Sequence, residues 1–180
     1  TKIALNRLEL PNRLEDSSAL DPRLLMATDF SVDKLWIAER DIGSLSFELR
    51  IEPSGALFNN ISGNIFGLEP GVYSKEAPTD FFWGYDGKNH LSKLVGPIGI
   101  NNIGDLFSSF DLPQVLDSQS GRLDADITWR GEPWTINKDN LIGDFKISLI
   151  DGNFYRTPGG AGTALKLVGL FNFANWLRRL

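Results

Sequence analysis

The sequence has no cysteine, and His90 is the only histidine among its 180 residues. The lack of cysteine excludes disulfide scaffolds, thiol nucleophiles and CxxC redox pairs, and with one histidine it also excludes zinc clusters. Because proteins of several compartments can lack cysteine, this count leaves the compartment open. No apolar run approaches the roughly 20 residues that a membrane-spanning helix needs.

An excess of basic charge is also missing. The chain has 18 basic and 23 acidic residues, a net charge of −5, which argues against a nucleic-acid binder because such proteins carry a basic face. The chain is 42% hydrophobic and 11% aromatic, with 18 glycines and 9 prolines. This composition predicts an ordered domain with many short elements joined by turns. We expect residues 1–180 to form a single β-rich domain, with residues 1–29 as an edge strand and its connection.

Alternation of apolar and polar residues is the dominant pattern. In Gly43–Glu52 every second side chain is apolar, and Arg122–Arg130 and Leu141–Ile150 repeat the pattern. A period of two over this length predicts strands with one apolar face. Further strands are expected at Lys2–Leu10, Phe30–Ile37, Ala56–Ser62, Asn64–Leu68, Gly71–Lys75, Asp80–Tyr85, His90–Val95 and Gly152–Arg156. Turn sequences between them, such as Asp86-Gly87, predict a meander of antiparallel strands.

Two segments have a helical pattern. Asn101–Phe110 is short, and Pro113 prevents its continuation. Thr163–Leu180 carries a broad apolar band, with Arg178 and Arg179 at its C-terminal end, as suits an amphipathic helix. The predicted fold class is therefore mainly β, a meandering antiparallel sheet with one apolar face, plus a C-terminal amphipathic helix and one short helix.

No catalytic motif is present. Asp124 and Asp126 share one strand face, and we interpret them as its solvent side, because catalytic carboxylates normally face each other across a cleft. His90 lies in no nucleophile motif and is interpreted as a surface or edge-strand histidine rather than a general base. The glycine-rich run 158–163 lacks phosphate-loop spacing and is interpreted as a helix entry. We expect no enzyme, no metal and no cofactor.

The aromatic residues allow two interpretations. Five tryptophans and twelve phenylalanines can close a two-layer core, which is their ordinary use. They can also line an open apolar groove that binds acyl chains. Composition favours the core, whereas the shortage of helix to cover the sheet favours the groove.

Four segments, taken in order, resemble a known family. They are Phe30–Asn60, Gly121–Gly131 followed by Pro133, Leu141–Phe154, and Thr163–Leu180. Their strand and glycine patterns are similar to repeated elements of the bacterial AsmA-like family, and their order is most similar to its YhdP branch. The resemblance covers Phe30 to Leu180 and indicates the C-terminal portion of a longer chain.

The resemblance implies a bridge-like lipid-transfer protein of the Gram-negative envelope. In this family a long, curved β-sheet forms an apolar trough that moves phospholipid between the inner and outer membranes and supports outer-membrane integrity. The chain would then be the periplasmic portion of a protein anchored in the inner membrane. Its partners would be phospholipid acyl chains, neighbouring segments of the same parent chain and other envelope proteins, with no nucleic acid.

An apolar trough needs no catalytic residue, because burial of each methylene contributes about 0.8 kcal/mol. Candidate lining residues are Leu45, Phe47, Leu49, Ile51, Leu123, Ile127, Trp129, Phe145, Ile147 and Leu149. The opposite, solvated face would carry Glu48, Arg50, Asp124, Asp126, Asp144 and Lys146. One alternative is a structural or interaction module with a closed core and edge-strand pairing. A third hypothesis is a carbohydrate-active enzyme that uses two of the aspartates, but no motif supports it.

Overall fold

The computed structural model describes residues 1–10, 20–37, 39–101, 104, 116–118, 120–136, 139–150 and 153–154. Its strands are β1 (Lys2–Leu5), β2 (Leu8–Leu10), β3 (Thr28–Ile37), β4 (Arg40–Glu52), β5 (Gly55–Ile65), β6 (Leu68–Pro70), β7 (Asp80–Tyr85), β8 (His90–Ile100), β9 (Leu116–Asp117), β10 (Ser120–Arg130), β11 (Leu141–Ile150) and β12 (Asn153–Phe154). Two short 3-10 helices, η1 (Pro22–Leu24) and η2 (Pro133–Thr135), complete the described elements.

The predicted C-terminal helix, Thr163–Leu180, lies outside the described residues, as does most of the predicted Asn101–Phe110 helix. No helix in the described part of the chain is long and apolar enough to cross a membrane.

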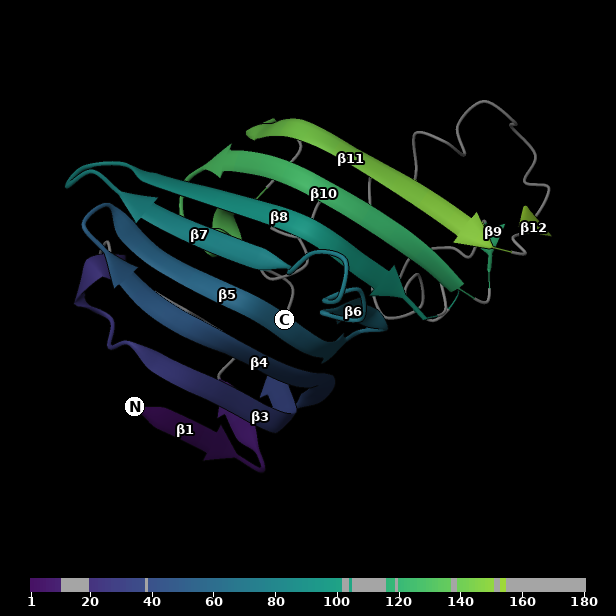
Figure 1. Ribbon diagram of the computed structural model, residues 1–180, viewed down its shortest axis with the longest axis horizontal. Helices are drawn as coiled ribbons and strands as arrows, with labels where there is room; N and C mark the ends of the chain where they lie inside the picture. The colour runs from purple at the N-terminus through teal and green to yellow at the C-terminus, as the bar shows by residue number, and fades with distance from the viewer. Residues whose placement is uncertain are drawn as a thin grey trace.

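Ten strands form one mixed sheet, in the order β1-β3-β4-β5-β6-β8-β10-β11. β2 extends the β1 edge by pairing with β3. Both β6 and β7 lie between β5 and β8, with β7 at the start of β5 and β6 at its end. Figure 1 shows this sheet as a twisted, bowed ribbon array running from β1 at one edge to β11 at the other. The strands from β3 to β11 pair antiparallel, as the meander predicts.

The first predicted strand, Lys2–Leu10, needs correction. It is split into β1 and β2, and both pair parallel with β3 rather than antiparallel. A parallel pair requires a crossover longer than a hairpin turn. The chain between Leu10 and Thr28 supplies that length, so the edge of the sheet is parallel and the whole sheet is mixed.

Elsewhere the predicted strands differ mainly in their bounds. β7 and β11 have the predicted bounds, whereas Ala56–Ser62 and the first part of Asn64–Leu68 form one continuous strand, β5. The predicted strand Gly71–Lys75 is wrong, because this segment forms turns, with the Ser74 amide donating to the Gly71 carbonyl at 3.0 Å. Gly71 has a φ of 81°, a left-handed conformation that glycine adopts at little cost.

Strand pairing divides the side chains of the sheet into two faces. One face, here called the apolar face, is defined by residues that pair one after another across neighbouring strands from β4 to β10: Leu49, Phe58, Phe81, Leu94 and Ile127. The opposite, polar face is held by charged pairs, such as Lys93 Nζ with Asp126 Oδ1 at 3.0 Å and Arg50 Nη2 with Glu48 Oε2 at 2.8 Å. The predicted apolar face is present, whereas the opposite face is mixed, because Leu57, Leu91 and Val95 lie on it beside the charged pairs.

Two clusters of buried side chains can be distinguished in the described part of the sheet. One contains Val32, Leu35 and Ile42, and the other contains Ala125, Ile127 and Trp129. η1 contacts β4, β5 and β7, while Trp134 of η2 packs edge-on against Trp83 of β7, with ring centroids 5.4 Å apart. Both 3-10 helices therefore lie beside the strand ends where β7 finishes.

Candidate functional site

A row of aromatic rings crosses the apolar face at right angles to the strands. Phe30 of β3 stacks on Phe47 of β4 with centroids 5.0 Å apart, and Phe47 meets Phe58 of β5 at 5.1 Å. Phe58 lies 5.7 Å from Phe81 of β7, and Phe81 lies 5.7 Å from Trp129 of β10. We call these five residues the aromatic ladder. Because neighbouring strands lie about 4.8 Å apart, strand pairing brings such rings into continuous contact.

The aromatic ladder is open along one part and closed at its end. Phe30, Phe47, Phe58 and Phe81 are only half-buried, whereas Trp129 is 4% exposed. Ser92 of β8, which is completely buried, pairs with both Trp83 and Trp129. Its small side chain leaves room for the two indole rings over β8. The apolar face thus combines a tightly packed end with a partly accessible aromatic surface over β3, β4, β5 and β7.

All ten sequence-predicted lining residues lie on the apolar face. In β4, alternation from Leu49, which pairs with Phe58, places Leu45, Phe47 and Ile51 on this face. In β10, alternation from Ile127, which pairs with Leu94, places Leu123 and Trp129 there. In β11, Ile147 pairs with Leu123, and alternation then places Phe145 and Leu149 on the same face. Their exposure differs: Leu49 and Ile127 are buried, while Phe145 is 40% exposed. The prediction lacked Phe30, Phe58 and Phe81, although each has a strand position from which alternation could have placed it.

The polar face accounts for the two aspartates that resemble a carboxylate pair. The Asp124 carboxylate accepts from Arg122 Nε at 2.8 Å, and Asp126 pairs with Lys93. Arg122 also donates to Glu76 at 2.6 Å and lies over the ring of Tyr73. Hydrogen bonds to Glu76 and then Asp124 raise the pKa of Arg122 above its usual value. The contacts of Arg122 attach the loop after β6 to the polar face. Asp124 and Asp126 therefore have a structural role there, as partners of Arg122 and Lys93.

His90 requires a correction, because it is buried and not a surface residue. It is 9% exposed, and its ring stacks on Tyr85 with centroids 4.4 Å apart and planes 19° from parallel. Its Nδ1 accepts a hydrogen bond from Trp83 Nε1 at 3.0 Å. Its Nε2 lies 3.7 Å from Glu132 Oε1 and has no hydrogen-bond partner among the described residues. The neighbours that cover it come from two other segments, which alternation within β8 could not reveal.

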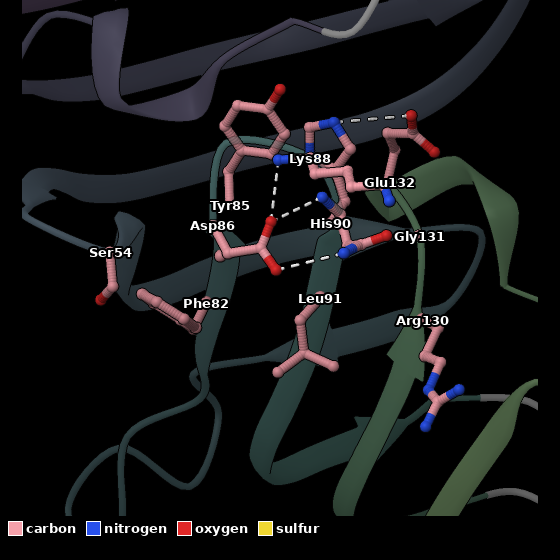
Figure 2. Close-up of a pocket in the computed structure, with 12 residues that line it drawn as sticks. Ser54, Phe82, Tyr85, Asp86, Lys88, His90, Leu91, Arg130, Gly131 and Glu132 are labelled. Atoms are coloured by element: carbon pink, nitrogen blue, oxygen red, sulfur yellow. Dashed lines mark hydrogen bonds and ion pairs between the residues drawn. The ribbon is translucent and has the colours of Figure 1, made fainter.

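A cavity of about 790 Å³ lies around this end of the β7–β8 hairpin. Its lining includes Tyr85, Asp86, Lys88, His90 and Glu132. Figure 2 shows the Tyr85, His90 and Glu132 side chains together on one side of the hairpin, and those of Phe82, Leu91 and Arg130 on the other. The cavity therefore borders both faces at the strand ends.

The hairpin turn is fixed by Asp86. Its carboxylate accepts from the backbone amides of Asn89 at 2.7 Å and Lys88 at 2.8 Å. The Asn89 backbone bond, with further bonds from the Asn89 side chain and the Lys88 amide, lowers the pKa of Asp86 below its usual value. Next to the hairpin, the hydrogen-bonded Arg23 side chain lowers the pKa of Asp21, and Arg23 itself lies over the Tyr85 ring at 5.2 Å.

Comparison with known proteins gives one match. The family model described as YhdP protein matches residues 1–180, the whole chain. No curated protein and no solved structure matches the chain. The match extends the sequence resemblance, which begins at Phe30, to the first residues.

Proposed function

The chain belongs to the YhdP family, and from this premise we propose that it is a segment of a bridge-like lipid-transfer protein of the bacterial envelope. In this proposal its apolar face is one stretch of a trough along which phospholipid acyl chains move between the inner and outer membranes. The segment lies in the periplasm and helps maintain outer-membrane integrity.

The observation that supports this function most is the aromatic ladder. Its rings run across the strands, along the direction in which a longer sheet of this kind extends. Phe30, Phe47, Phe58 and Phe81 remain partly accessible, whereas a closed core would bury them fully. A continuous apolar track of this kind stabilises an acyl chain by about 0.8 kcal/mol for each methylene that leaves water.

A second candidate function follows from the edge strand β11. Among the described residues β11 pairs only with β10, and its Ile142 and Ile150 are 66% and 62% exposed. An exposed edge of this length is a surface on which another strand can add. The alternative is therefore an interaction module that pairs through its edge and binds no lipid.

The first test is lipid content. We expect the protein, purified gently from a Gram-negative host, to carry phospholipid that native mass spectrometry resolves as added mass and solvent extraction identifies. The lipid should exchange with added phospholipid, because passive apolar contacts hold it. A protein that is lipid-free before and after incubation with phospholipid, and that self-associates through β11, would instead support the interaction module.

A further inference from the structure

A set of buried and partly buried polar and aromatic side chains lies on the apolar face where β7 ends and β8 begins. We call His90, Trp83, Tyr85 and Glu132 the His90 cluster. The His90 ring has its two nitrogens in different environments: Nδ1 accepts from the Trp83 indole at 3.0 Å, whereas Nε2 has no hydrogen-bond partner among the described residues. Because an indole N–H can only donate, Nδ1 must present its lone pair. The proton of the neutral ring is therefore at Nε2.

The Nε2–H group points toward an acceptor that it does not reach. Glu132 Oε1 lies 3.7 Å away, which is beyond hydrogen-bond range. The contact is also not an ion pair while Nδ1 accepts from Trp83. The Glu132 side chain is 25% exposed, and its backbone carbonyl, not its carboxylate, accepts from Trp129 and Thr135. A buried donor without a hydrogen-bond partner and a largely buried carboxylate thus stand side by side, and a buried donor in a folded protein normally has a partner.

The His90 cluster lies where the polar end of a lipid would be. Trp83 and Tyr85 are at the end of β7, and Tyr85 and Glu132 line the cavity around the hairpin. The aromatic ladder crosses the strands, so the strand ends form the margins of the apolar track. A lipid with acyl chains on the track therefore places its headgroup at a margin, beside Glu132 and the His90 Nε2–H (Figure 2).

We propose that the His90 cluster binds a zwitterionic headgroup, a phosphodiester joined to a primary ammonium. This inference rests on the proposed function. A phosphodiester oxygen accepts from His90 Nε2–H, and the ammonium donates to the Glu132 carboxylate. Without an amine, an anionic headgroup would leave the Glu132 carboxylate without a cationic partner and would place its own charge near that carboxylate. Of the nearby cations, Arg23 is already paired with Asp21 at 2.7 Å, and Arg130 lies on the other side of the hairpin (Figure 2). Amine-bearing phospholipid is therefore bound in preference to phosphatidylglycerol.

The experiment measures headgroup preference separately from total lipid binding. The purified protein is incubated with vesicles of equal phosphatidylethanolamine and phosphatidylglycerol content and identical acyl chains, and the bound lipid is then extracted and quantified. We expect about fivefold enrichment of phosphatidylethanolamine, a difference that one charge-assisted hydrogen bond can supply. Glu132→Gln should bring the ratio close to one with total bound lipid unchanged. Asp144→Asn, the same charge change on the polar face of β11, should leave the ratio as in the original protein.

A second pair of variants tests the histidine. His90→Gln retains an N–H donor and should keep part of the preference, whereas His90→Leu should lose it. Equal binding of the two lipids, or a preference that Glu132→Gln leaves intact, would overturn this inference while leaving lipid binding in place. Absence of lipid from every variant would overturn the proposed function itself, and the two failures are thereby distinguished. Circular dichroism of each variant confirms that it is folded.

Discussion

Phe58→Asp is expected to remove at least nine-tenths of the phospholipid that the protein binds. Phe58 is the central ring of the aromatic ladder and contacts both Phe47 and Phe81. A carboxylate at this position would remain hydrated, and it would prevent the adjacent part of the lipid acyl chain from contacting the aromatic ladder. Losing the contacts of two methylenes costs about 1.6 kcal/mol, and each 1.4 kcal/mol is tenfold in affinity.

The matched control is Leu57→Asp, one residue earlier in β5. Leu57 is half-buried like Phe58 but belongs to the polar face, since it pairs with Arg50 and Phe82. The Leu57→Asp variant introduces the same charge into the same strand without contacting the aromatic ladder. The amount of lipid that it binds should therefore stay within about twofold of the amount bound by the unsubstituted protein. The measurement is extracted lipid per folded protein, with Phe58→Ser as a milder variant that only removes the ring. Equal loss in both aspartate variants would mean that the effect is general destabilisation.

Trp129→Ala is expected to lower the free energy of unfolding by about 3–5 kcal/mol, as truncation of a buried tryptophan does. Trp129 is 4% exposed and packs with Ala125 and Ile127, with Phe81 and Leu94 against them. Its Nε1–H also donates to the Glu132 carbonyl at 3.0 Å. The substitution therefore removes both a filled core position and a bond that fixes the turn after β10.

Chemical denaturation measures this change, with Leu91→Ala as the control. Leu91, on the neighbouring strand β8, is 43% exposed, so its truncation should cost no more than about 1 kcal/mol. A loss below about 1 kcal/mol for Trp129→Ala would show that the tryptophan end of the apolar face is not the packed core described above.

The sequence predicted the faces of the sheet better than its edges. In Leu141–Ile150 and Asp80–Tyr85 the pattern and the flanking turns agreed, and the strands have the predicted bounds. The pattern of Lys2–Leu10 predicts a strand but does not predict its partner, because an apolar pattern contains no information about which strand it joins. The pattern of Gly71–Lys75 predicts a strand that does not form, because Gly71 takes a left-handed conformation that begins a turn.

The sequence predicts which residues lie on the apolar face, but it does not predict how the aromatic rings are arranged across the strands. Alternation placed Phe47 and Trp129 on the apolar face, yet the ladder depends on the register of β3 through β10, which strand patterns alone do not fix. In β5, Asn60 has a φ of 53° beside a register shift, and this bulge realigns Phe58 with Leu49. The predicted Asp86-Gly87 hairpin could place Tyr85 beside His90, but Glu132 comes from the turn after β10, so the pattern of β8 alone could not indicate the burial of His90.

The measurement that tests the central claim most directly is residue-level mapping of a bound acyl chain. A phospholipid with a photoactivatable diazirine near its acyl terminus is loaded onto the protein and irradiated, and labelled peptides are sequenced by mass spectrometry. The account predicts labels on the apolar face of β3, β4, β5 and β7, at or beside Phe30, Phe47, Phe58 and Phe81, that excess unlabelled phospholipid removes. Labels confined to the polar face, for example at Leu57 and Phe82, or labelling that excess phospholipid does not reduce, would contradict it.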